Sequence, residues 1–119
     1  MLAEKYRFHG HGSLKFVYSR GQVVRSKLFI TKYTHNPRRK QPRIAVVVSK
    51  KVMKSAVKRN RIRRRLYEII RLELPGLIQQ TDIVFIVISP DVLLAPHADL
   101  QAAVRRSFVQ ANLYNQGKN

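Results

Sequence analysis

A dense group of basic residues lies near the middle of the chain, between Lys58 and Arg65. The segment reads KRNRIRRR, so six of its eight side chains are basic and only Asn60 and Ile62 interrupt the charge. Guanidinium groups bind phosphate oxygens through paired donors and stack on bases, and an asparagine amide can bind a base edge or a sugar hydroxyl. This combination favours binding to structured nucleic acid.

The whole chain is strongly basic. Its 119 residues include 24 Lys and Arg against 6 Asp and Glu, which gives a formal net charge of +18. This excess exceeds what solubility requires and indicates a polyanionic partner. Because 45% of the residues are hydrophobic, we expect one folded domain over residues 1–119, with flexible ends at residues 1–12 and 115–119.

Composition also argues against several classes of protein. The chain has no cysteine, which excludes disulfides and thiolate metal sites and fits a reducing compartment. Residues 1–12 lack the apolar run of a signal peptide, and the longest apolar run, Ile83 to Ile88, is too short to span a bilayer. We therefore expect a cytoplasmic protein that does not bind membranes.

Changes in apolar periodicity divide the chain into short helices and strands. Apolar runs at Ile44–Val48 and Ile83–Ile88 are typical of buried strands, and helical spacing predicts the main helix between them, from Ser55 to Leu74. The general rule makes such a βαβ crossover right-handed. We expect an α+β domain with a four-stranded sheet and three helices. The other elements are predicted at 13–19, 23–24, 28–33 and about 100–111, with an exposed loop at 36–43.

The main helix separates apolar from basic residues. Between Lys50 and Arg71 there are ten basic residues and one acid, Glu68. A solvated face is the ordinary explanation of a basic helix, but like charges with so few acidic partners repel one another, so polyanion binding is preferred. Steps of about 100° per residue place three groups on different sides: Ile62, Leu66, Ile69 and Ile70 toward the sheet; Asn60, Arg63, Tyr67 and Arg71 on a ridge; and Arg61, Arg64 and Arg65 elsewhere.

The segment around this helix resembles a known family. SKKVMKSAVKRNRIRRRLYE, residues 49–68, is similar to the signature of the bacterial ribonuclease P protein subunit: a Lys-rich segment, Ala, then Arg-Asn-Arg-x-Lys/Arg-Arg. Val17–Gly21 resembles the family's aromatic-x-x-Gly segment, Phe29 its following strand and Asp82–Pro90 its last strand. The resemblance covers nearly the whole chain. It implies a left-handed βαβ crossover, which we adopt against the general rule.

The resemblance implies a function for an assembly. Proteins of this family bind a large catalytic RNA that uses bound Mg²⁺ to remove the 5′ leader from precursor tRNA. The chain is then expected to be the accessory subunit of a ribonucleoprotein endoribonuclease, monomeric without RNA, with catalytic RNA and precursor tRNA as partners. The protein alone would require no cofactor and supply no catalytic residue. The residues expected to bind RNA are Lys50, Lys51, Lys54, Lys58, Arg59, Asn60, Arg61, Arg63, Arg64, Arg65 and Tyr67.

The family also binds the single-stranded leader in a cleft beside the sheet. Tyr18 matches an aromatic of that cleft, although it could instead be a core aromatic. Leu14 stands where the family often has Phe, and Lys32 stands where it often has Tyr, with Tyr33 next in sequence. We expect Leu14, Tyr18 and Tyr33 in the cleft, and leave open whether Lys32 or Tyr33 faces it.

No protein catalytic site or metal site is evident in the sequence. The six acids are scattered, and His9 and His11 form a poor ligand set that better suits a loop or an RNA contact. The basic loop Arg38–Lys40 either contacts RNA or is solvated. A ribosomal RNA-binding protein is one alternative, but it would not be expected to carry the whole motif. A protein nuclease is another, disfavoured by the sparse carboxylates.

Overall fold

The fold is a four-stranded sheet with three helices. The structure is a computed structural model that describes residues 6–8 and 12–115, so parts of both chain ends, and His9 and His11, lie outside the described residues. The predicted α+β class is confirmed. The elements are α1 (Gly12–Arg20), β1 (Gln22–Arg25), β2 (Phe29–His35), β3 (Arg43–Val48), α2 (Ala56–Glu73), the 3-10 helix η2 (Leu74–Gly76), β4 (Thr81–Val87), the 3-10 helix η3 (Pro90–Leu93) and α3 (His97–Gln110).

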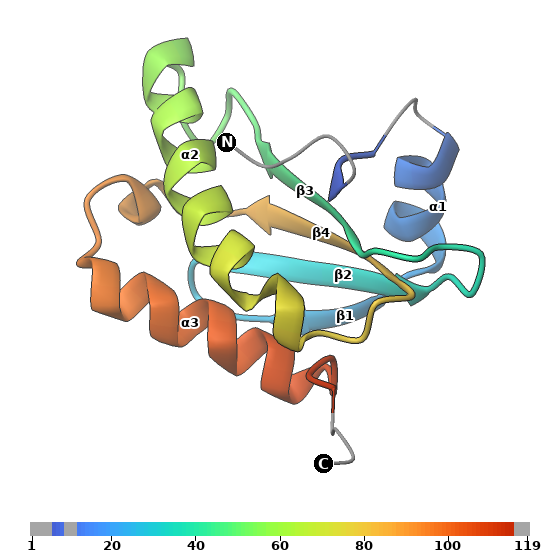
Figure 1. Ribbon diagram of the computed structural model, residues 1–119. Coiled ribbons are helices and arrows are strands. Elements are labelled where there is room, and N and C mark those ends of the chain that lie inside the picture. Colours follow the sequence, from blue (N-terminus) through green and yellow to red (C-terminus); the bar gives the residue numbers. More distant parts are fainter. Residues whose placement is uncertain (1–5, 9–11, 116–119) are drawn as a thin grey trace.

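The sheet has the strand order β1-β2-β4-β3. Strand β2 pairs antiparallel with β1 and β4, whereas β3 and β4 are parallel and are joined through α2. In Figure 1 both parallel strands run toward the left, α2 lies in front of the sheet, and β4 lies below β3. This arrangement is a left-handed crossover. The handedness implied by the family resemblance is therefore confirmed, and the general rule fails for this chain.

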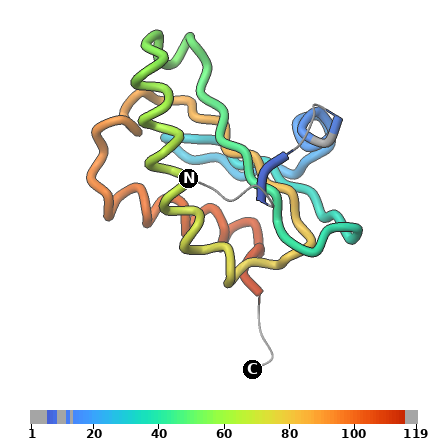
Figure 2. Tube along the Cα trace, turned by 45° about the horizontal axis from the view of Figure 1, so that its top comes forward, coloured from blue at the N-terminus to red at the C-terminus, as the bar shows by residue number. Residues whose placement is uncertain are grey.

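The helices cover opposite faces of the sheet. Helices α2 and α3 lie on one side and α1 on the other (Figure 2). Since successive strand residues point to opposite faces, β4 divides accordingly: Ile83 and Phe85 belong to the main core cluster under α2 and α3. Val84 points the other way, and it is fully buried, as is Val17 of α1. No helix of the described residues is long and apolar enough to cross a membrane.

Helix α2 begins and ends close to its predicted bounds. The Ser55 hydroxyl caps the helix by accepting a hydrogen bond from the Lys58 amide at 3.2 Å. The helix ends at Glu73, where the chain continues into η2 because Pro75 lacks the amide hydrogen that a continuing α-helix would use. The buried residues of α2 are the four that its periodicity predicts: Ile62, Leu66, Ile69 and Ile70.

A glycine closes the turn between α1 and β1. The Gly21 amide donates to the Val17 carbonyl oxygen at 2.8 Å. A Cβ atom at position 21 would lie 2.4 Å from that same oxygen and 3.2 Å from the Tyr33 amide nitrogen. Only glycine permits this close approach, and it brings α1 directly against β2.

A buried ion pair joins β3 to β4, and it corrects one expectation. Arg43 was expected in an exposed loop, but it begins β3 and is only 8% exposed. Its Nε and Nη2 atoms donate to the two carboxylate oxygens of Asp82 at 2.8 and 2.7 Å. The Asn36 amide donates to Asp82 Oδ2 at 3.0 Å, and the Phe8 ring centroid lies 4.8 Å from the guanidinium carbon. Paired donors and acceptors allow these charges to be buried.

Removing one partner of this pair should be strongly destabilising. We expect Arg43→Met to lower the free energy of unfolding by about 3–5 kcal/mol, because Asp82 would be left buried without its cation. Urea denaturation measures this difference. Arg71→Met serves as the control, since it breaks an ion pair with Glu68 whose side chains are about half exposed, and should change stability little. Equal losses in the two variants would contradict the prediction.

Candidate nucleic-acid interface

Six cations at the start of α2 and in the loop before it extend into solvent. All six are exposed, and none of their side chains forms a hydrogen bond or ion pair among the described residues. Their charges are therefore available to an external anion. Asn60 is exposed beside them. The six cations are Lys50, Lys51, Lys54, Lys58, Arg61 and Arg64, which we call the α2 cationic surface.

Asn60 and Arg63 form a polar pair on the same side of α2. Arg63 Nη2 donates to Asn60 Oδ1 across one helical turn, as residues three apart can do. The interaction occupies the amide oxygen of Asn60, whereas its two amide hydrogens bond to no described residue. The pair fixes a guanidinium beside an amide, an arrangement suited to a phosphate next to a base or a sugar hydroxyl.

Two arginines expected at the interface bind the backbone instead. Arg59 Nη1 donates to the carbonyl oxygens of Met53 and Lys54, at 3.0 and 2.8 Å, in the loop before α2. Arg65 Nη1 donates to the Val92 and Leu93 carbonyls at 2.8 and 2.9 Å, and its Nη2 donates to the Ala95 carbonyl at 2.6 Å. These hydrogen bonds hold the loop before α2 and the segment around η3 in place. In the protein without RNA, both guanidinium groups therefore serve the fold first.

Tyr67 also has a structural position that the sequence did not indicate. Its hydroxyl accepts a hydrogen bond from the Val46 amide at 3.0 Å, on the outer edge of β3. The ring is half-buried against the core cluster. Farther along this edge, Arg7 forms a parallel bridge with Ile44. Both contacts cover backbone groups of an edge strand, which would otherwise be open to pairing with another chain.

On the face of the sheet that α1 covers, opposite to α2 and α3, Tyr18 lies against Lys32. Lys32 Nζ donates to the Tyr18 carbonyl oxygen at 2.9 Å and lies 5.3 Å from the centroid of its ring. Burial raises the pKa of the Tyr18 hydroxyl. Leu14 is half-buried on the same helix. The structure thus assigns Lys32, and not Tyr33, to the face that α1 covers.

Tyr33 lies on the opposite face from Tyr18. It packs against the core cluster under α2 and α3, and its hydroxyl donates to Gln22 Oε1 at 3.1 Å. The expectation that Tyr33 shares a cleft with Tyr18 is therefore wrong. The reason is the alternation of strand side chains: with Phe29 in the core, Tyr33 falls on the core side and Lys32 on the other.

The acidic residues in the second half of α2 form ion pairs. Arg71 donates to Glu68 at 3.0 Å, which lowers the pKa of the Glu68 carboxyl. Glu73 accepts hydrogen bonds from Arg105 at 2.9 Å and from the Tyr114 hydroxyl at 2.6 Å. Burial, followed by that hydrogen bond, raises the pKa of Tyr114. Among the described residues, no group of three or more His, Cys, Asp or Glu could hold a metal ion.

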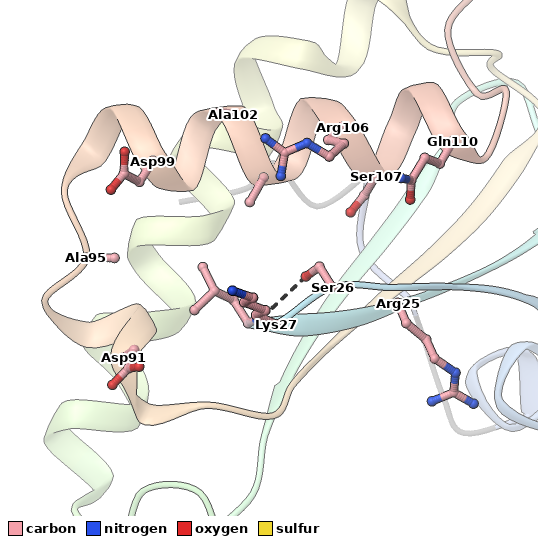
Figure 3. A pocket seen from close by; sticks show the side chains of 12 residues that line it. Arg25, Ser26, Lys27, Asp91, Ala95, Asp99, Ala102, Arg106, Ser107 and Gln110 are labelled. Carbon is pink, nitrogen blue, oxygen red and sulfur yellow. Dashed lines mark hydrogen bonds between the residues drawn. The ribbon is translucent and has the colours of Figure 1, made fainter.

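A cavity of about 640 Å³ lies between the β1–β2 turn and α3 (Figure 3). Three cations, Arg25, Lys27 and Arg106, line it together with two carboxylates, Asp91 and Asp99. The helix side of the cavity carries small residues such as Ala102. The two carboxylates offset most of this positive charge and no residue of α2 lines the cavity, so it does not extend the α2 cationic surface.

These features define a small α+β protein with a left-handed crossover, whose crossover helix carries exposed cations without partners among the described residues. The sequence model of the Ribonuclease P family matches residues 2–112, and the chain belongs to this family. A ribonuclease P protein component of Chloroflexus aurantiacus is 43% identical over 76 residues, which are 64% of this chain and 56% of that protein. One of Chloroflexus aggregans is 48% identical over 58 residues, 49% of this chain and 43% of that protein. The matched regions span about half the length of these relatives.

Solved structures show the same fold. The ribonuclease P protein of Staphylococcus aureus superposes with a TM-score of 0.80 at 24% identity, covering 92% of this chain and 98% of that one. A further structure of the Staphylococcus aureus protein gives a TM-score of 0.75 at 26% identity over the full length of both chains. The protein from Thermotoga maritima gives 0.69 at 19% identity, covering 88% of this chain and 93% of that one.

The two kinds of arginine on α2 should behave differently on substitution. We expect Arg65→Met to lower the free energy of unfolding by about 1–3 kcal/mol, because three carbonyl groups are deprived of a charged donor. Arg64→Met should leave stability nearly unchanged, since the Arg64 side chain is exposed and bonds to no described residue. Urea denaturation of both variants gives the comparison. A decrease in Arg64→Met as large as that in Arg65→Met would contradict this division.

Proposed function

We propose that the chain is the protein subunit of ribonuclease P and that it binds the catalytic RNA through the α2 cationic surface. The observation that carries the proposal is the set of six cations that bond to no described residue, on and before the helix that bears the family motif. Phosphate neutralisation with counterion release would supply most of the affinity. The Asn60–Arg63 pair would add contacts to a sugar or base.

In this proposal the RNA performs the chemistry. Hydrolysis of the phosphodiester bond at the 5′ end of precursor tRNA would be carried out by the catalytic RNA with Mg²⁺, and no protein side chain is assigned a proton or a nucleophile. The protein contributes positive charge that lowers repulsion between two RNA molecules. Its effect should therefore be largest where Mg²⁺ is scarce, because the same repulsion is then poorly screened.

The face of the sheet beside Tyr18 and Lys32 would receive the single-stranded leader. The Tyr18 ring offers a surface on which a base can stack, and Lys32 offers a cation to the adjoining phosphate. Leu14 contributes an apolar side chain but no aromatic platform. Recognition on this face would then depend more on charge, and less on stacking, than in relatives with a second and a third aromatic ring.

A reconstitution tests the assembly directly. Purified protein mixed with the catalytic RNA and precursor tRNA at low Mg²⁺ should increase the rate of leader removal over that of the RNA alone. Gel analysis of the 5′ product measures the rate. Absence of any gain would overturn the proposal, and cleavage by the protein without RNA would instead identify a protein nuclease.

Neutralising part of the α2 cationic surface tests the mode of binding. Replacing Lys58, Arg61 and Arg64 together with Ala should weaken binding to the catalytic RNA. It should also make the log-log salt dependence shallower, by about 0.7–0.9 for each phosphate that the variant no longer neutralises. The three side chains bond to no described residue, so the fold should persist.

A variant with the same change in net charge provides the control. Arg25, Lys27 and Arg106 lie on β1, on the β1–β2 turn and on α3, and none of their side chains bonds to a described residue of α2. Their replacement with Ala should leave the salt slope close to that of the unmodified protein. Equal slopes in the two triple variants would show that only net charge matters and that the α2 cationic surface does not meet phosphates.

A further inference from the structure

A second cavity lies on the α1 side of the sheet, where β2 ends and β3 begins. Its volume is about 580 Å³, within the range of pockets that bind small ligands. Its lining comes from three places in the chain: α1, the end of β2 with the following loop, and the ion pair between β3 and β4. We call it the Phe16 pocket. The residues that matter for its chemistry are Phe16, Thr34, Asn36, Arg38, Arg43 and Asp82.

The Phe16 pocket is on the other side of α1 from Tyr18. Val17 points into the sheet and is fully buried. Because each helical step turns about 100°, Phe16 and Tyr18 project to opposite sides of Val17. Tyr18 contacts Lys32, whereas Phe16 lines the pocket with Arg38. The two sites therefore share a helix but can be altered independently.

The floor of the pocket is polar and fixed. Arg43 and Asp82 hold each other through two hydrogen bonds, and Asn36 donates to Asp82 from the loop. The Asn36 side-chain oxygen also accepts a hydrogen bond from the Arg38 backbone amide at 3.3 Å, which fixes the loop backbone at Arg38. Since Arg43 and Asp82 neutralise each other, the net charge at the pocket comes from the exposed Arg38.

Phe16 is the unusual member of this set. It is 56% exposed although it is large and apolar, and it sits at the rim of a pocket in a strongly basic protein. An exposed ring beside a guanidinium that bonds to no described residue offers the two groups that bind a single-stranded nucleotide: a stacking surface for the base and a fork for the phosphate. Thr34 and Asn36 add polar groups to the lining.

We propose that the Phe16 pocket binds one nucleotide of single-stranded RNA, with its base stacked on Phe16 and its phosphate at Arg38. The proposal rests on the function proposed above, since it requires that RNA be the partner. An unpaired nucleotide of the precursor leader and one of the catalytic RNA have this same chemistry. The measurements below separate these two sources.

The chain contains no tryptophan, so Phe16→Trp introduces a single fluorescent reporter at the pocket. Titration with an unstructured single-stranded oligoribonucleotide should quench its emission in a saturable manner, because the indole stacks on a base. A second substitution in the reporter variant, Arg38→Ala, should lower the affinity for the oligoribonucleotide. Val109→Trp, on an exposed position of α3, is the matched reporter and should show little quenching. Equal quenching at both reporters, or none at Phe16→Trp, would overturn the proposal.

Affinities of the assembled ribonucleoprotein identify the source of the nucleotide. Phe16→Leu keeps an apolar side chain but removes the ring, and it should weaken binding by about 5-fold or more. Weaker binding of leader-bearing precursor but not of mature tRNA assigns the leader. Weaker binding of the protein to the catalytic RNA assigns that RNA. Unchanged affinity in all three measurements would contradict a nucleotide site at Phe16.

These outcomes are distinct from failure of the proposed function. If Phe16→Leu has no effect while the unmodified protein still binds catalytic RNA and accelerates leader removal, only the pocket proposal fails. If the unmodified protein neither binds that RNA nor accelerates cleavage, the proposed function fails as a whole. Tyr18→Ala provides an internal comparison, because it alters the other side of α1 and should leave quenching of the Phe16→Trp reporter intact.

Discussion

Burial of one side of α2 against the sheet is the interaction on which this molecule depends. Ile62, Leu66, Ile69 and Ile70 are each at most 1% exposed, and burying a side chain of this size contributes about 1.5–3 kcal/mol. Like charges four residues apart, such as Arg61 and Arg65, cost only a few tenths of a kcal/mol. The apolar contacts therefore outweigh the repulsion by a wide margin. A helix this basic can stay folded and positioned without a bound polyanion.

Backbone carbonyl groups allow the protein to fix arginines without using acids. Arg65 ties α2 to two carbonyl oxygens of η3 and to that of Ala95 just after it, and Arg59 ties the start of α2 to the preceding loop through two carbonyl oxygens. A carboxylate in these places would have cancelled the positive charge of the helix. A carbonyl oxygen accepts the same hydrogen bonds and leaves the net charge unchanged. Structural order and a strongly positive surface are thereby obtained from the same residue type.

The sequence predicts the elements and the buried stripe of α2 because both follow from local periodicity. Ser55 and Pro75 mark the helix ends, and Ile62 through Ile70 recur at helical spacing. The sequence could not distinguish residues of the same type that have different partners far away in the chain. Arg64 and Arg65 are neighbours in sequence, yet only Arg65 reaches residues 92–95. Tyr67 likewise binds a strand edge 21 residues away, a contact that no local pattern specifies.

The placement of Lys32 and Tyr33 was open for a related reason. Alternation in β2 requires that one of them face α1, but the sequence alone does not say which. Pairing with β4 decides it, since Phe29 opposite Val87 puts both residues in the core and carries Tyr33 to that side. The buried position of Arg43 depends on the same pairing. Opposite Asp82, a residue expected in a solvated loop becomes half of a buried ion pair.

The direction of α2 gives its charge distribution a further meaning. Helix N-termini carry partial positive charge and favour acids, yet α2 has no acid in its first turn, and its two acids, Glu68 and Glu73, lie in its second half. The exposed cations Lys54, Lys58 and Arg61 cluster at the end where the dipole is least favourable to them. An anion bound at that end would interact favourably with the dipole and with the cations together. The distribution of charges along α2 is thus unfavourable for the isolated helix at the surface where we propose that RNA phosphates bind, and bound phosphates would make it favourable.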